Sequence, residues 1–440
     1  MFSKIKKLRG KKEGTLAWNT LMLYVLTFSG TLISTLIFPY EYKVLTKNGA
    51  DGYGDLAVAM AVMLYFQLLI EFGFQVSATD EVSRNREDRA LQSVIMTSVT
   101  WCKLLICACS LLLLYVLCQV IDAWKGRFSL YLLFFIGTAI NAIMPDYLYR
   151  GLEKMSAITI RTVCIRVFSA IGIILFLKEP EDLWVIPILT AIGNFVAVFV
   201  CFYDAYKRLH VRFCTVRLRD IWLRMKQSSS FFLARFATTA FTALHTVILD
   251  IIEPEYILVN DKLIKNTVRS NYASADKLMS TGKQAMSPIS DSLYPYMVKY
   301  HDYRLVKKVL LILEPIIALL SVVVFIFAPQ FCELLLGPES VSAGKVLRVM
   351  MPTAIVILPQ YICGFPMLSS MGLAKHANYS IYVCSIVHLI MLSVLYFTGN
   401  INMLTLGAAI TVTECLILCY RLVVIWRYRD RLKEKAHVDS

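Results

Sequence analysis

Charged residues are scarce in this chain. They make up 17% of its 440 residues, whereas a soluble protein of this length carries roughly 25%. Hydrophobic residues make up 58%, and the mean hydropathy is +0.62. These values argue against a water-soluble globular domain and indicate a polytopic membrane protein.

The sequence also lacks the patterns that carry chemistry. It contains no nucleotide-binding loop, no cluster of residues at metal-ligand spacing and no nucleophile constellation. None of its twelve cysteines forms a C-x-x-C pair, so we interpret them as free thiols in apolar segments. The longest predicted outer loops, 39–53 and 252–266, are too short for a catalytic domain. We therefore expect no enzymatic activity, cofactor or metal, and an ion gradient rather than ATP as the energy source.

Twelve segments are long enough to cross a bilayer as helices. The N-terminal basic residues precede a first apolar run that is too long for a signal peptide, so we interpret it as a retained span. The eighth segment is the most polar of the set. The predicted spans are 16–38, 55–76, 91–120, 128–148, 157–177, 183–206, 228–251, 267–297, 306–328, 345–367, 376–398 and 403–426.

The distribution of basic residues tests this count. Alternate loops, together with both termini, carry 28 Lys and Arg residues, whereas the opposite loops carry 7. Basic loops face the cytoplasm, so twelve spans place both termini there, in the cytoplasmic (inner) membrane. The net charge of +14 arises mainly at the ends of apolar blocks, which favours the lipid bilayer over nucleic acid as the partner.

A basic segment in the middle of the chain divides it. Segment 207–227 carries seven basic residues and one acidic residue, and six apolar blocks lie on each side. We predict an N-terminal six-helix bundle at 1–206, a cytoplasmic linker at 207–227 and a C-terminal six-helix bundle at 228–440. The fold class is all-α, with about twelve transmembrane helices in two bundles. A faint repeat between 39–59 and 253–278 supports the division.

The eighth predicted span carries a polar stripe. At about 100° per residue, six side chains fall near one line along the helix, and such a stripe must face protein or water rather than lipid. A water-filled cavity and plain pairing with neighbouring helices both explain it. The stripe consists of Arg269, Asp276, Ser280, Lys283, Ser287 and Asp291.

Most of the charged residues that we expect at membrane depth are basic. Arg166 and Arg235 lie well inside the fifth and seventh spans, and Lys277 and Lys283 lie on the eighth. Guanidinium groups match the oxygens of phosphate, so we expect an anionic substrate. The acids Asp276, Glu314 and Glu414 are candidate carriers of a coupling ion, proton or sodium, although membrane carboxylates also serve as counter-ions. His245 and His388 fit satisfied core residues.

Prolines recur on one face of the tenth span. Pro352, Pro359 and Pro366 are seven residues apart, and each removes a backbone hydrogen bond. They predict either a static kink or a hinge for alternating access.

Several stretches together resemble a known family, the polysaccharide repeat-unit flippases of the multidrug/oligosaccharidyl-lipid/polysaccharide exporter superfamily, of O-antigen or capsule type. The similar stretches are EFGFQVSATDEVSRNR (71–86), YLYRGLEKMSAITIR (147–161), NYASADKL (271–278), SPISDSLYPYM (287–297) and LLLGPESVSAGKVLRVMMP (334–352).

This resemblance implies two bundles around a central cavity and movement of an undecaprenyl-pyrophosphate-linked oligosaccharide to the outer leaflet. It also implies that Arg166, Arg235 and the basic residues of the eighth span, Arg269, Lys277 and Lys283, line the cavity. A multidrug cation antiporter of the same fold and a lipid II flippase are alternatives. A polysaccharide polymerase or ligase would need an outer domain or a catalytic constellation.

Overall fold

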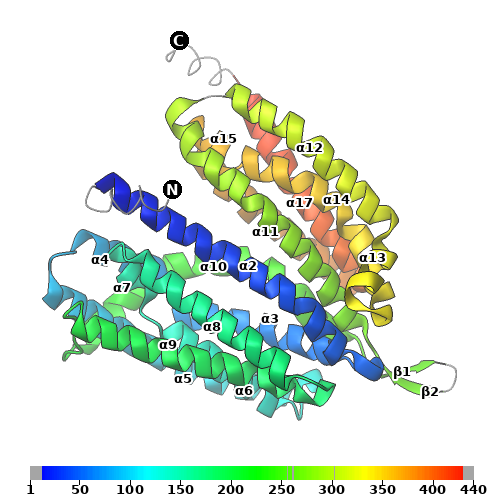
Figure 1. The fold of residues 1–440 in the computed structure, drawn as a ribbon, viewed down its shortest axis with the longest axis horizontal. Coiled ribbons are helices and arrows are strands. Elements are labelled where there is room, and N and C mark those ends of the chain that lie inside the picture. Colours follow the sequence, from blue (N-terminus) through cyan, green and yellow to red (C-terminus); the bar gives the residue numbers. More distant parts are fainter. Residues whose placement is uncertain (1–11, 255, 260–261, 302, 430–440) are drawn as a thin grey trace. The chain divides into compact units, whose positions relative to one another are not determined.

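The structure is a computed structural model that describes residues 12–254, 256–259, 262–301 and 303–429. The terminal residues before 12 and after 429 carry part of the basic charge predicted for the cytoplasmic side, and they lie outside the described residues. The described chain is helical apart from one short hairpin (Figure 1). The all-α prediction is confirmed, with this hairpin as an addition.

The chain forms two compact units. Unit 1 comprises residues 1–47 and 58–236, and unit 2 comprises 48–57 and 237–440. The helices of unit 1 are α2 (Lys12–Leu45), most of α3 (Gly52–Glu71), α4 (Phe74–Arg84), α5 (Arg89–Val120), α6 (Phe128–Ile143), α7 (Asp146–Gly151), α8 (Met155–Phe176), α9 (Val185–Lys207) and the first half of α10 (Leu218–Ile252), with the short 3-10 helices η2 (Asp122–Trp124) and η3 (Pro180–Trp184).

Helix breaks in unit 1 follow from local sequence. Gly73 separates α3 from α4 and has a φ of 76°. Residues other than glycine rarely adopt this backbone conformation. A Cβ at this position would also lie 2.7 Å from the Ser228 carbonyl oxygen. Pro145 precedes α7, and Asp88 caps α5 by accepting a hydrogen bond from the Leu91 N–H at 2.9 Å.

Unit 2 contains a hairpin in which β1 (Tyr256–Val259) runs antiparallel to β2 (Lys262–Lys265), with Tyr256 opposite Lys265. Its remaining elements are η1 (Lys47–Gly49, mostly within this unit), the second half of α10, α11 (Val268–Tyr300), α12 (Tyr303–Ile326), α13 (Ala328–Leu336), η4 (Pro338–Ser340), α14 (Val341–Cys363), α15 (Phe365–Ser370), α16 (Ala374–Phe397) and α17 (Met403–Arg427).

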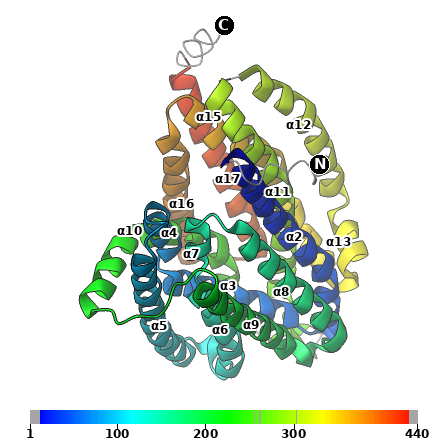
Figure 2. The same ribbon diagram turned by 60° about the vertical axis from the view of Figure 1, so that its left-hand side comes forward.

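Helix packing differs between the units. In unit 1, α9 packs on α6 and α8, and α2 packs on α8. In unit 2, α14 is central and packs on α11, α12, α13 and α17. α16 packs on α17, and the two helices lie side by side in Figure 2. The outer face of α12 is apolar, since its most hydrophobic window has a mean hydropathy of 2.9 and only 6% of it is buried. Such a surface indicates contact with lipid.

The predicted spans match the helices. Nine helical segments of the described chain are long and apolar enough to cross a membrane. α2, α10 and α11 are not among the nine, but they have 34, 35 and 33 residues, which gives about 50 Å each at 1.5 Å per residue. Together these account for twelve predicted spans. The C-terminal part of segment 207–227 is helical, because α10 already begins at Leu218.

Candidate functional site

The polar stripe of α11 meets α14 and α17 at a partly buried ion pair. Lys283 Nζ donates to Glu414 Oε1 at 2.6 Å, and Gln360 Nε2 donates to Glu414 Oε2, also at 2.6 Å. The side chains of Lys283 and Glu414 are 21% and 12% exposed. Both oxygens of the carboxylate therefore have a donor, and three helices are joined by charge-assisted hydrogen bonds.

Asp276 and Lys277 lie two turns before Lys283 on the same helix, and both are partly exposed. Asp276 interacts electrostatically with Lys283 and Lys277. This group of α11 and α17 residues therefore contains two cations and two carboxylates. An anionic ligand could bind Lys283 only in competition with Glu414.

Arg269 lies at the start of α11 and is surrounded by carboxylates. Its Nε lies 2.7 Å from Asp51 Oδ2 and its Nη2 lies 3.1 Å from Asp55 Oδ1, and it also pairs with Asp250. Asp51 is fully buried, and Arg269 is 5% exposed. This cluster ties residues 48–57 to α10 and α11. It lies about 21 Å from Lys283 along the helix, at 1.5 Å per residue.

Backbone contacts complete the cluster around Arg269. The Ser270 hydroxyl donates to Asp51, and the Gly54 N–H donates to Ser270 Oγ at 2.8 Å. Burial raises the pKa of the Asp51 carboxyl to about 6, although Arg269 and Ser270 oppose this shift. The family resemblance implied that Arg269 lines the cavity, whereas Asp51, Asp55 and Asp250 were not among the predicted site residues. The faint repeat between 39–59 and 253–278 marked the two segments that meet here.

The two predicted arginines of unit 1 lie in different surroundings. Arg235 on α10 pairs with Glu71 at 2.9 Å and donates to Gln75 at 3.2 Å. The guanidinium of Arg166 on α8 lies across α2 at Gly30, where an added Cβ would be 1.8 Å from Arg166 Nη1. Arg161, also on α8, pairs with Asp146 at 2.9 Å, and its side chain is 10% exposed.

Glu314 and the prolines complete the set of predicted residues. Both carboxylate oxygens of Glu314 on α12 are buried without a hydrogen-bond partner among the described residues. Pro352 and Pro359 lie inside α14, which stays helical through both, and the helix ends only at Cys363. Pro366 lies in the first turn of the separate helix α15.

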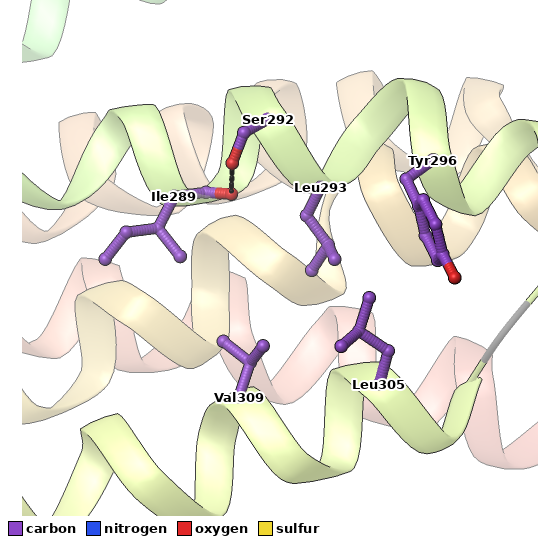
Figure 3. Close-up of a pocket in the computed structure, with 6 residues that line it drawn as sticks. All are labelled: Ile289, Ser292, Leu293, Tyr296, Leu305 and Val309. Carbon is purple, nitrogen blue, oxygen red and sulfur yellow. Dashed lines mark hydrogen bonds between the residues drawn. The ribbon is translucent and has the colours of Figure 1, made fainter.

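Each unit contains a cavity among its described residues. In unit 2, an apolar cavity of about 290 Å³ lies between α11 and α12, where Leu293 faces Leu305 (Figure 3). In unit 1, a larger cavity of about 880 Å³ lies between α8 and α9, and Lys154, Arg161 and Arg208 are among the residues that line it. Because the cavity of unit 2 is apolar, it offers a surface for a hydrocarbon chain. Among the described residues, no group of three His, Cys, Asp or Glu side chains could hold a metal ion.

Comparison with known proteins adds sequence and fold relationships. Residues 16–301 match the family model described as "Polysaccharide biosynthesis protein". The chain is 23% identical over 418 residues to a protein of Shigella dysenteriae named "Putative O-antigen transporter". The matched region covers 92% of this chain and 99% of the relative. A protein of the same name from Escherichia coli (strain K12) is 20% identical over 415 residues, with 92% and 96% covered.

Solved structures share the fold. The lipid II flippase MurJ in an inward closed conformation matches with a TM-score of 0.69 at 12% identity, covering 96% of this chain and 90% of that one. A MOP superfamily transporter from Pyrococcus furiosus matches with a TM-score of 0.59 at 12% identity, covering 98% of each chain. At these identities the likeness shows the fold alone. The family match covers well over half of the sequence, and this multi-pass membrane protein of transporter type therefore belongs to the polysaccharide biosynthesis protein family.

Proposed function

We propose that the protein is a flippase that moves an undecaprenyl-pyrophosphate-linked oligosaccharide repeat unit across the cytoplasmic membrane by alternating access. Its family and the names of its relatives support a transporter acting in polysaccharide synthesis. The observation that carries the proposal is the Lys283–Glu414–Gln360 cluster, an ion pair held between three helices. Both termini would be cytoplasmic, as the basic loops indicate.

The exchange of partners at Lys283 is the central step. In this structure Glu414 neutralises the ammonium group of Lys283. A pyrophosphate that approaches can take over this cation, and Glu414 then loses its partner. A carboxylate left unpaired in the membrane is costly, so Glu414 would take up a proton or another cation when substrate binds. Asp276 is near enough to interact with Lys283 and would share this role, and Glu314 is a further carrier on α12.

The arginines of unit 1 would supply a second set of phosphate ligands. Arg166 and Arg235 are both only partly buried, and the side chain of Arg235 is 43% exposed even though it pairs with Glu71. We assign Lys277 a supporting role beside Lys283. Arg269 has a different role in this proposal, because three carboxylates already surround its buried guanidinium.

Substitution of Lys283 tests the proposal. Lys283→Ala should lower translocation per folded molecule by about tenfold to a hundredfold, the loss of one hydrogen bond to a charged group. Lys283→Arg should retain most of the activity because the charge remains. Lys345→Ala, an exposed lysine on α14, is the matched control and should behave as wild type. The measurement is lipid-linked oligosaccharide that becomes accessible at the outer leaflet, normalised to folded protein.

The same assay separates the alternatives. Loss of surface polysaccharide with accumulation of the lipid-linked repeat unit in a deletion strain supports the proposal. Accumulation of lipid II instead would support a peptidoglycan precursor flippase, whose fold this chain shares. Sensitivity to cationic drugs without either change would support a multidrug antiporter. Full translocation by Lys283→Ala would remove the cluster from the substrate site.

A further inference from the structure

Two histidines meet in the interior of unit 2. His245 on α10 and His388 on α16 are both 0% exposed, and their Nε2 atoms lie 2.8 Å apart. His245 Nδ1 lies 2.7 Å from the hydroxyl of Tyr272 on α11. His388 Nδ1 lies 2.6 Å from the hydroxyl of Thr413 on α17. A single chain of hydrogen bonds therefore joins α10, α11, α16 and α17. The two histidines at its centre are 143 residues apart in the sequence.

For two neutral rings, the contacts assign the protons in this chain of hydrogen bonds. The Thr413 hydroxyl donates to the Ala409 carbonyl at 2.8 Å, so its oxygen accepts from His388 Nδ1–H. His388 Nε2 is then an acceptor, and His245 Nε2–H is its donor. His245 Nδ1 in turn accepts from the Tyr272 hydroxyl. Both imidazoles are neutral in this arrangement, and one hydrogen lies between them.

The arrangement cannot accept another proton unchanged. The acceptor lone pair on His388 Nε2 already faces a hydrogen from His245. A proton can still be added at His245 Nδ1, which leaves one hydrogen between the two Nε2 atoms and lets the two rings share the positive charge. The Tyr272 hydroxyl must then turn from donor to acceptor, because its hydrogen and the new N–H cannot both point along the 2.7 Å contact. Because Tyr272 belongs to α11, protonation would change the contact between α10 and α11.

We propose that His245 and His388 form a proton-binding site that couples protonation to the contact of α10 with Tyr272 on α11. The arrangement of two neutral rings is its proton-free form. Binding adds one proton to His245 Nδ1, keeps one hydrogen between the two Nε2 atoms and yields an imidazolium ion that the two rings share. The Tyr272 hydroxyl turns to accept from His245 Nδ1–H and donates its own hydrogen elsewhere, so a proton shifts the population toward that conformation.

Ionisable groups from the neighbouring helices connect the pair with the Lys283 cluster. On α11, Tyr272 is followed one turn later by Asp276, which acts on it electrostatically. On α17, Glu414 follows Thr413 and acts on His388, and Lys283 pairs with it. α16 contributes Cys384, which Glu414 also influences, and α14 contributes the neutral Gln360. The imidazolium ion thus has two carboxylates as potential partners, and Asp276 is partly exposed and can exchange protons with water.

Protonation is measured directly on the purified, reconstituted protein. The chain has six histidines, and ¹⁵N-histidine spectra distinguish a neutral ring from an imidazolium ion. His245→Gln and His388→Gln identify the two signals, because glutamine keeps a hydrogen-bonding amide near the Nε2 position but cannot bind a proton in this range. His376→Gln is the matched control, since His376 lies on the same helix α16 and bonds to Tyr420 instead.

We expect the His245 and His388 signals to be neutral at pH 8 and at least one of them to become an imidazolium ion by about pH 5, the range in which histidine changes charge. In His388→Gln, the His245 signal should stay neutral over a wider range. The proposal is wrong if both signals stay neutral down to pH 5 in protein that remains folded. If His388→Gln does not fold, the wild-type titration and His245→Gln decide the question in the same way.

Coupling to transport rests on the proposed function and is tested separately. In vesicles with and without an imposed proton gradient, wild type and His376→Gln should translocate lipid-linked oligosaccharide faster with the gradient. His245→Gln and His388→Gln should show equal rates in both conditions. A gradient response retained by both variants would exclude the pair from coupling. Absence of translocation by wild type would contradict the proposed function, whereas the ¹⁵N titration would still decide whether the pair binds a proton.

Discussion

The three carboxylates around Arg269 make a sharp prediction about stability. Arg269→Met keeps most of the side-chain length but removes the charge that Asp51, Asp55 and Asp250 share. Asp51 and Arg269 are both buried, so solvent cannot replace the lost partner. Removing one member of a buried ion pair costs about 3–5 kcal/mol, which is a large fraction of the stability of a typical domain. We therefore expect a severe loss of folded protein.

The measurement is the fraction of protein that remains monodisperse in detergent after heating, followed by size-exclusion chromatography. Lys345→Met is the control, because a substitution at an exposed position usually changes stability by less than about 0.5 kcal/mol. Adding Asp51→Asn to Arg269→Met should restore part of the loss, since it removes one of the unpaired charges. If Arg269→Met is as stable as Lys345→Met but does not transport, the anchoring role is wrong and Arg269 belongs to the substrate site.

Further predictions concern pH, topology and two helix contacts. Burial raises the pKa of Asp51 from 3.8 to about 6, so the folded state holds this proton more tightly than the unfolded state does. The stability of wild type relative to Asp51→Asn should therefore rise as the pH falls from about 6 to about 4. Melting curves at several pH values measure this difference. In a cysteine-free background, Lys125→Cys should react with an impermeant thiol reagent from outside and Arg217→Cys should not; the reverse pattern would invert the topology. Gly30→Val should displace the Arg166 guanidinium and lower transport as much as Arg166→Ala, whereas normal transport by both would remove Arg166 from the substrate site. Pro359→Ala should leave the protein folded and slow transport if α14 bends during the cycle, and wild-type rates for both Pro352→Ala and Pro359→Ala would assign these residues a static role.

The membrane helices could be predicted because a bilayer imposes a strong constraint on sequence. Each span needs about 20 apolar residues, and the predicted 91–120 and 403–426 match α5 and α17 closely. Even α11 could be predicted, because the distribution of basic residues in the flanking loops requires a span there. The break at Gly73 was not predicted, because hydropathy does not register a single left-handed residue.

The candidate site was only partly predictable. The stripe on α11 follows from its own periodicity, but its partners lie more than a hundred residues away, as Glu414 does from Lys283. The count of deep charges included Arg235, and the resemblance placed Arg269 in the cavity, whereas the structure places carboxylates beside both. The histidines show the same limit: each was expected to be a satisfied core residue, but the contact between them depends on how α10 and α16 pack.

The insertion of residues 48–57 into unit 2 has a consequence for biosynthesis. Asp51 and Arg269 are 218 residues apart in the chain, and the ribosome adds about 5–20 residues per second. Arg269 is therefore synthesised about 10–40 s after the acidic loop that follows α2, when most of unit 1 has already been inserted. During that interval Asp51 and Asp55 must stay hydrated or protonated, so this loop closes late in synthesis. Nascent chains that stop short of α11 should leave the loop open to protease, and chains extended past α11 should protect it.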